Sequence, residues 1–174
     1  MKVHQGGSLF LPSSITAIGA FDGVHLGHQM LIERLVERSK KLGVPSVVYT
    51  FDPPPRIYFN DVKQLTLIEE KVKRIHALGV VHVVVAQFNK DYLNRSVQQF
   101  INDLLAFHPI EIIVGSDFRF GKNRSGGIEE LKQYFQVYLM DSICCAKGNV
   151  ISSTRIRELL LSGKKKEAEI LLNW

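Results

Sequence analysis

Short apolar runs alternate with amphipathic segments along this chain, and this alternation constrains the fold more than any other feature. In Gly27–Leu42, for example, Leu31, Ile32 and Leu35 fall on one side of a predicted helix. Strands that alternate with helices are typical of a parallel sheet, and continuous apolar runs are typical of strands covered on both faces. The sequence therefore predicts an α/β fold with a doubly wound, five-stranded parallel sheet. The predicted strands are Ile15–Ala20, Ser46–Phe51, Val80–Phe88, Ile110–Gly115 and Val137–Ile143.

Local signals predict where some helices begin. Thr66 with Glu69, and Ser96 with Gln99, have the spacing of a capping box, so we expect helices to begin at Thr66 and Ser96. The segment Asp52–Arg56 holds three prolines. Because proline disfavours helix interiors and central strands, this segment is predicted to be a stiff loop.

Length and charge limit the function classes. A chain of 174 residues has the length of one domain, so residues 1–174 are expected to form a single domain. The net charge of +5 is compatible with nucleic-acid binding and equally with binding of polyanionic small molecules. Cys144 and Cys145 are adjacent and are interpreted as an apolar pair. The longest apolar run is about half as long as a membrane helix, and no signal peptide is recognised, so a cytoplasmic protein is expected.

The run "AIGAFDGVHLGH", from Ala17 to His28, leads from a predicted strand into a predicted helix. His25 and His28 would lie at the helix N-terminus, where free N–H groups and the helix dipole favour phosphate. Imidazole adds hydrogen-bond donors and can be charged near neutral pH. A zinc site is disfavoured because no third histidine or cysteine lies at a familiar spacing. Local capping or packing of the two histidines remains an open alternative.

The run "ISSTRIR", residues 151–157, forms a second candidate anion site. One of its three hydroxyls is expected to be an ordinary N-cap. Arg155 and Arg157 would then lie in the first helical turn, where a cation opposes the dipole at a cost of roughly 0.3–1 kcal/mol. A bound polyphosphate would remove that conflict.

Two further loops combine aromatic and basic residues. In "VGSDFRFGKNRSGG", residues 114–127, the phenylalanines either stack on a flat ring or anchor the loop to the core. In "TFDPPPR", Phe51 and Arg56 flank a rigid wall of prolines that suits an aromatic ligand bearing a phosphate. These loops follow strand ends, where parallel sheets bind ligands. Because the sequence contains neither a P-loop nor a nucleophile elbow, direct transfer of a nucleotidyl group between two phosphorylated substrates fits best.

"GAFDGVHLGH", "TFDPPPR", "VGSDFRFGKNRSGG" and "ISSTRIR", in this order, resemble the FMN adenylyltransferase domain of bacterial FAD synthetases. These bifunctional riboflavin kinase/FMN adenylyltransferases belong to the HxGH nucleotidyltransferases, whose fold is Rossmann-like. The resemblance extends over nearly the whole chain and includes Leu65–Val85. It implies the reaction of ATP with FMN to give FAD and pyrophosphate, with Mg²⁺.

The resemblance also implies roles for individual residues. His25, His28 and Arg157 would be the catalytic residues. The ATP site would comprise Gly19, Phe21, Asp22, Gly23, His25, Gly27, His28, Gly115, Ser153, Thr154 and Arg157. The flavin site would comprise Phe51, Pro53, Arg56, Asp117 and Phe120. We expect Mg²⁺ to be held mainly by phosphates and water, with Asp117 as the one carboxylate to consider.

This sequence departs from the family pattern in two places. Pro54 stands where family members commonly carry histidine, which puts one flavin or phosphate contact in doubt. The chain ends at Trp174 without the Pro-Thr-Ala-Asn motif of the riboflavin kinase domain. We therefore expect no kinase activity from these residues, whether the kinase domain is a separate partner or has been truncated.

Two other functions are compatible with the sequence. One is an HxGH adenylyltransferase with a different phosphorylated acceptor, although "TFDPPPR" and "VGSDFRFG" belong to the flavin branch of the resemblance. The other is a non-catalytic nucleotide-, flavin- or RNA-binding domain, for which Lys164–Lys166 would be the support. Short charge runs usually face water, so no nucleic-acid partner is expected, and no membrane partner either.

Overall fold

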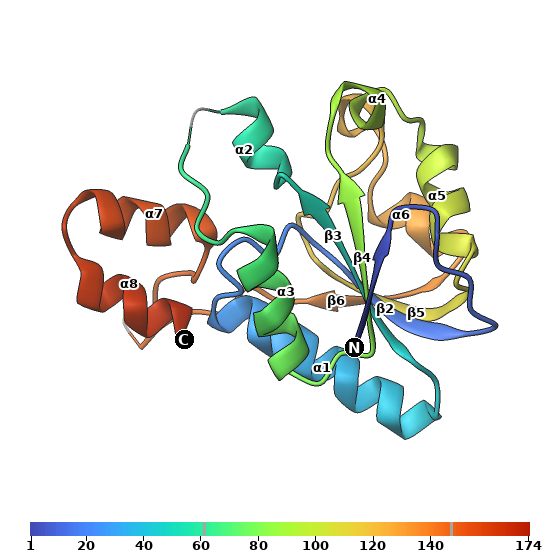
Figure 1. Ribbon diagram of the computed structural model, residues 1–174, viewed down its shortest axis with the longest axis horizontal. Coiled ribbons are helices and arrows are strands. Elements are labelled where there is room, and N and C mark those ends of the chain that lie inside the picture. Colours follow the sequence, from blue (N-terminus) through green and yellow to red (C-terminus); the bar gives the residue numbers. More distant parts are fainter. Residues whose placement is uncertain (61, 147) are drawn as a thin grey trace.

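The computed structural model describes residues 1–60, 62–146 and 148–174. Within them, six parallel strands form one sheet in the order β1-β4-β3-β2-β5-β6, with helices on both faces (Figure 1). The strands are β1 (Lys2–Gln5), β2 (Ser14–Ile18), β3 (Ser46–Asp52), β4 (His82–Gln87), β5 (Pro109–Gly115) and β6 (Gln136–Met140). The helices are α1 (Leu26–Leu42), α2 (Pro55–Phe59), α3 (Ile68–Ala77), α4 (Lys90–Leu93), α5 (Val97–Leu105), α6 (Ile128–Lys132), α7 (Ser153–Leu161) and α8 (Lys165–Leu172), with a 3₁₀ turn, η1, at Lys122–Arg124.

The doubly wound parallel α/β fold is confirmed, but the predicted number of five strands was wrong. The missed strand, β1, pairs with β4 from Lys2↔His82 to Gln5↔Val85. It lies at the edge of the sheet and is mostly exposed. Val3 is its one aliphatic residue, so the strand lacks the apolar run by which the others were recognised.

Three hydrophobic clusters hold the layers together. Helices α1 and α3 cover one face of the sheet, with Leu35 and Ile75 in that cluster. Helices α5 and α6 cover the opposite face, with Leu104 and Leu131 in theirs. A smaller third cluster lies between α7 and α8, which Figure 1 shows together at one side of the sheet. The described part of the chain contains no helix that is both long and apolar enough to cross a membrane.

The local predictions had mixed outcomes. Ser96 and Gln99 form the predicted capping box at the start of α5. The prediction at Thr66 was wrong, because α3 begins at Ile68 and the Thr66 hydroxyl accepts a hydrogen bond from the backbone N–H of Gly23 instead (3.0 Å). The prediction of a loop over Asp52–Arg56 was wrong at both ends, because Asp52 is the last residue of β3 and α2 begins at Pro55. Proline is well suited to the first helical turn, because no backbone N–H is needed there.

The topology places the candidate site. The chain passes from β2 to β3 and β4 on one side of the sheet, and then returns to place β5 and β6 on the other side of β2. Such a reversal opens a crevice at the carboxyl ends of the strands, where doubly wound folds bind ligands. All four motif segments come together at this end.

Candidate active site

A cavity of about 1190 Å³ lies at the carboxyl ends of the strands. Typical pockets for drug-sized ligands measure roughly 300–1,000 Å³, so this cavity has room for two nucleotide-sized molecules. It is lined by most of the residues predicted for the site: Gly19, Phe21, Asp22, His25, Gly27, His28, Phe51, Arg56, Gly115, Asp117, Phe120, Ser153, Thr154 and Arg157.

Two predicted site residues do not line this cavity. Gly23 has φ +85°, a left-handed backbone that favours glycine, and a Cβ there would come within 3.0 Å of Leu65 and 3.1 Å of Leu172. Gly23 therefore shapes the loop from behind and offers no surface to a ligand in the cavity. Pro53 is also absent from the lining, to which Pro54 and Pro55 contribute instead.

His25 and His28 stack on each other at the start of α1. Their ring centroids are 3.6 Å apart and their planes differ by 16°. His25 is the N-cap, and its Nδ1 accepts a hydrogen bond from the backbone N–H of His28 (3.4 Å). A Cβ on Gly27 would lie 3.3 Å from the His25 ring, so glycine leaves room for the stack. The sequence left open whether the two histidines cap and pack locally or bind phosphate. The structure shows local capping and packing, and the pair also lines the cavity.

Both imidazoles are neutral at pH 7 in the substrate-free protein. Burial lowers the pKa of His25 from 6.5 to about 4. Burial, followed by repulsion from His25 and Lys71, holds the pKa of His28 well below 6.5. Without a ligand, burial therefore favours the neutral form of both rings. Negative phosphate oxygens nearby would favour the charged form and raise both pKa values.

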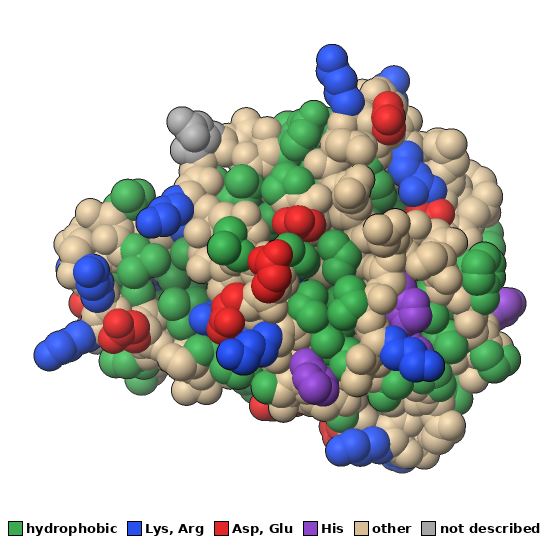
Figure 2. Space-filling model, viewed as in Figure 1, with side chains coloured by type: hydrophobic (Ala, Val, Ile, Leu, Met, Phe, Trp, Pro, Cys, Tyr) green, Lys and Arg blue, Asp and Glu red, His purple; other side chains and the backbone are tan. Residues whose placement is uncertain are grey.

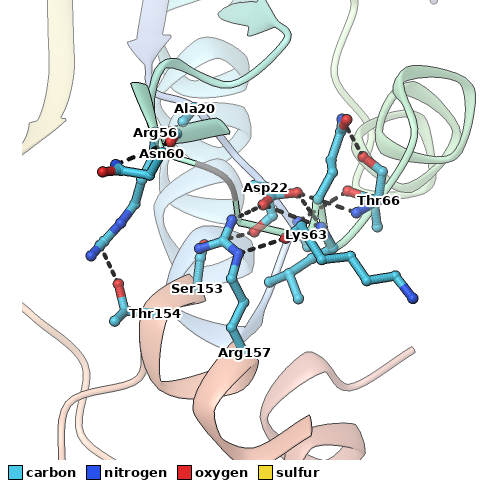
Figure 3. Close-up of polar contacts among 12 residues, drawn as sticks. Ala20, Asp22, Arg56, Asn60, Lys63, Thr66, Ser153, Thr154 and Arg157 are labelled. Atoms are coloured by element: carbon cyan, nitrogen blue, oxygen red, sulfur yellow. Dashed lines mark hydrogen bonds and ion pairs between the residues drawn. The ribbon is translucent and has the colours of Figure 1, made fainter. Parts of the chain in front are cut away.

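A buried ion pair joins the two anion-site motifs (Figure 3). The Arg157 guanidinium donates to the Asp22 carboxylate, and its Nε donates to the Lys63 carbonyl (2.7 Å). Backbone N–H groups of Leu65 and Thr66 also donate to Asp22, at 3.0 and 3.2 Å. Asp22 is thus fully occupied within the protein. Nη1 of Arg157 is buried and has no hydrogen-bond partner among the described residues, which leaves it available to a ligand.

Each of the three hydroxyls of "ISSTRIR" makes a different contact. Ser152 is the N-cap of α7, which confirms the expected cap. The Ser153 hydroxyl donates to the Asp22 carbonyl (2.8 Å), and Arg56 donates to the Thr154 hydroxyl (Figure 3). The guanidinium of Arg155 turns away to Cys145 and the Asn149 carbonyl, at 3.1 and 3.2 Å. Arg155 does not line the cavity, so its predicted part in the anion site was wrong.

Aromatic rings form the other side of the cavity. Phe51 packs edge-on against Phe88 and Tyr92, with centroids 6.0 and 5.8 Å away. Phe120 lies 4.7 Å from Phe100 and is buried in the main core cluster, so this loop is anchored to the core. Its ring nevertheless contributes to the lining of the cavity.

The loop that leads into α1 has an unusual backbone that side chains hold in place. Phe21 and Val24 have φ of 48° and 42°, which costs of order 1–3 kcal/mol at each residue. The Val24 carbonyl accepts hydrogen bonds from Gln29 and from Trp174 Nε1, both at 2.8 Å. Arg74 donates to the Gly23 carbonyl (2.9 Å). These bonds fix the approach of the chain to the stacked histidines.

Comparison with known proteins agrees with this geometry. The sequence model of the family described as FAD synthetase matches residues 10–155. The chain belongs to the FAD synthetase family.

Named relatives in the FAD synthetase family are bifunctional riboflavin kinase/FMN adenylyltransferases. That of Listeria monocytogenes is 34% identical over 93% of this chain, and that of Escherichia coli K12 is 35% identical over 91%. The chain spans about half of these relatives, 54% and 53% of their length. A Geobacillus thermodenitrificans protein, given the same name provisionally, is 51% identical and is matched over 98% of its length.

A solved structure titled "Crystal Structure of Macrolide-efflux Protein from Streptococcus pneumoniae" is similar to this FAD synthetase family member. The two superpose with a TM-score of 0.85 at 29% identity, over 99% of this chain and 61% of the other. The similarity supports the α/β fold described above.

Sequence reasoning missed one residue beneath the site, Lys71 of α3. It is fully buried, and its Nζ donates to the carbonyls of Ala20 (3.1 Å) and Phe51 (2.8 Å). The available signal was its position, three residues after Ile68 and four before Ile75, on the apolar side of the helix. Burial lowers the pKa of Lys71 from 10.5 to about 8, although nearby Asp22 and Asp52 oppose the change.

We expect Lys71 to make the stability of this domain rise with pH. Below pH 8 the lysine is charged in both states, and the folded state bears the full cost of burial. Between about pH 8 and 10.5 the folded state has released the proton while the unfolded chain retains it, so unfolding binds a proton and stability increases. The whole change is about 3 kcal/mol at 1.36 kcal/mol per pKa unit.

Urea denaturation of the wild-type protein and of Lys71→Met at several pH values measures this effect. Subtracting the unfolding free energy of the variant from that of the wild type cancels the contributions of the other titrating groups. This difference should rise between pH 7 and 10.5. A difference that does not change with pH would contradict the burial of a charged Lys71.

Proposed function

We propose that this chain transfers the adenylyl group of ATP to FMN, giving FAD and pyrophosphate. The observation that carries the proposal is that two buried atoms, Nδ1 of His28 and Nη1 of Arg157, have no hydrogen-bond partner in the described part of the chain, on residues that line one cavity. Buried polar groups normally have hydrogen-bond partners, so an anionic ligand would complete this site. Membership of the FAD synthetase family and the aromatic side of the cavity identify the ligands as ATP and a flavin nucleotide.

In the proposed reaction, an oxygen of the FMN phosphate attacks the α-phosphorus of ATP. A new P–O bond forms, the bond to the bridging oxygen breaks, and pyrophosphate leaves with the electron pair. His25 and His28, at the N-terminus of α1, donate hydrogen bonds to the phosphates and stabilise the charge on the α-phosphoryl group. Such positioned donors contribute more in a partly dry site than in water.

The remaining predicted residues divide between the two substrates. Gly19, Phe21, Asp22, Gly27 and Gly115 would form the walls of the ATP site. Ser153, Thr154 and Arg157 would bind the β- and γ-phosphates and the leaving pyrophosphate. Phe51, Arg56, Asp117 and Phe120 would form the flavin side, with Pro54 in place of Pro53.

Mg²⁺ fits the oxygen donors of the cavity. The exposed carboxylates of Asp117 and Asp141 both belong to the lining, and Mg²⁺ prefers phosphate, water and a few carboxylates. When bound, the ion would neutralise charge on the ATP phosphates. Asp22 is unsuited as a ligand, because its carboxylate is already occupied by Arg157 and two backbone N–H groups.

We propose that residues 1–174 form one adenylyltransferase domain that works in the cytoplasm and carries no riboflavin kinase activity. The support is that the FAD synthetase family model spans residues 10–155 and that the sequence contains no Pro-Thr-Ala-Asn motif. On the face shown in Figure 2 the basic side chains are dispersed among acidic ones, so this face offers no continuous basic surface to RNA. A non-specific RNA binder needs a continuous basic surface.

The first experiment incubates the protein with ATP, Mg²⁺ and either FMN or riboflavin, and separates the flavins by chromatography. We expect FAD from FMN, and neither FMN nor FAD from riboflavin. A mixture without ATP is the control for flavin carried through purification. Failure to form FAD from FMN would contradict the proposed transfer, and product from riboflavin would contradict the absence of kinase activity.

A further inference from the structure

Lys71 is a buried cation to which the proposed transfer gives no direct role. The side chain is fully buried on α3, and Lys71 is not among the described residues that line the cavity. Burial of an ammonium group is costly unless it is well hydrogen-bonded. Its Nζ donates to backbone carbonyls of two segments: Ala20, which follows β2 (3.1 Å), and Phe51, near the end of β3 (2.8 Å).

These carbonyls lie where two neighbouring strands separate. The β2–β3 ladder ends with Ile18 paired to Tyr49, followed by a bond from the Gly19 N–H to the Tyr49 carbonyl (3.1 Å). Beyond this point one chain becomes the loop 19–28, which carries the stacked histidines and is here called the donor loop. The other continues as residues 51–56, which comprise the end of β3, the turn after it and the start of α2. This segment carries Phe51 and Arg56 and is here called the acceptor loop.

Lys71 ties the two loops together just beyond the ladder. Thr50 provides a second link, because its hydroxyl also donates to the Ala20 carbonyl (3.1 Å). The charged groups around the ammonium include Asp22 on the donor loop and Asp52 on the acceptor loop. Lys71 is also close enough to His28 to lower the pKa of that ring. The ammonium therefore lies between the groups proposed to act on ATP and those proposed to face the flavin.

We propose that Lys71 is a positioning residue that fixes the separation of the donor and acceptor loops, and so governs the rate of transfer more than the affinity for either substrate. This inference rests on the proposed adenylyl transfer. Transfer between two bound substrates requires the attacking oxygen close to the phosphorus and in line with the leaving group. A displacement of about 1 Å can lower the rate of such a step by about a hundredfold.

The test compares Lys71→Met with Lys73→Met. Methionine is unbranched and of similar length to lysine, but it has no ammonium group to donate to the two carbonyls. Lys73 lies on the same helix and is exposed, so its replacement is the matched control. For Lys71→Met we expect kcat for FAD formation to fall by roughly ten- to a hundredfold, with KM for ATP and for FMN within about threefold of wild type. Lys73→Met should retain wild-type kinetics.

Thr50→Val provides a second variant in case Lys71→Met does not fold. Valine has nearly the shape of threonine and suits a strand, but it removes the second link to the Ala20 carbonyl. We expect a smaller fall in kcat, about threefold, again without a matching rise in KM. Unchanged kcat in a folded Lys71→Met protein, or a rise in KM with kcat preserved, would overturn the positioning role.

Hydrogen exchange tests the same inference without catalysis. Mass spectrometry of peptides covering residues 15–22 and 49–56 reports how often the two chains separate. We expect faster exchange in Lys71→Met than in Lys73→Met. Equal exchange would reject the link between the loops, even if the wild-type protein makes FAD. Conversely, a wild-type protein that makes no FAD would overturn the proposed reaction and leave the exchange result to decide the positioning role.

Discussion

His28→Ala is expected to lower kcat for FAD formation by about a hundredfold or more, the typical loss for one transition-state donor. The ring of His28 lines the cavity, stacks on His25 and has an unpartnered buried Nδ1. Because the hydrogen bonds strengthen as charge develops during transfer, kcat should fall more than the affinity for ATP. Steady-state kinetics with saturating FMN and Mg²⁺ measure both quantities.

The control for this prediction is His76→Ala on α3. His76 is exposed and does not line the cavity, so its removal should leave kcat unchanged. A melting temperature of His28→Ala close to that of wild type would establish that the fold is intact. A folded His28→Ala enzyme with near-normal turnover would refute the role given to this histidine.

The sequence was sufficient to predict the elements that contain most of the site. The apolar runs located β2 to β6, and the motif at Ala17–His28 correctly placed the two histidines at the start of a helix. These features depend on residues close together in the chain. Local periodicity failed for β1, whose pairing with β4 depends on backbone hydrogen bonds and whose one aliphatic residue is Val3.

The interactions between motifs were less accessible from the sequence. Asp22 pairs with Arg157, which lies 135 positions away in the sequence, and no local sequence pattern predicts this pairing. Similarly, Thr66 had a good capping-box partner in Glu69, yet tertiary structure directed its hydroxyl to Gly23. Protonation was also hard to predict, because it depends on burial. Burial lowers the pKa of His25 to about 4 and that of Lys71 to about 8, and it holds the pKa of His28 well below 6.5.

Arg157→Ala is expected to have two separate effects, because this side chain serves both the fold and the proposed ATP site. Its loss removes the hydrogen-bonded counter-charge of the buried Asp22 carboxylate and leaves Lys71 as the neighbouring cation. Breaking a buried ion pair by removal of one partner typically costs about 3–5 kcal/mol, so the free energy of unfolding should fall by that amount. Loss of the free Nη1 should raise KM for ATP by roughly tenfold or more, since hydrogen bonds to charged groups contribute about 1.5–3 kcal/mol.

A double-mutant cycle with Asp22→Ala separates these effects. If the pair acts through mutual charge compensation, Asp22→Ala/Arg157→Ala should be less destabilised than the sum of the single variants, while KM for ATP stays high. Arg155→Ala is the control for the kinetics, because Arg155 lies in the same helical turn but contacts Cys145 and Asn149. Unchanged KM for ATP in a folded Arg157→Ala protein would show that Arg157 does not bind ATP and serves only as the counter-charge of Asp22. Strict additivity in the cycle would instead show that the two side chains stabilise the fold independently.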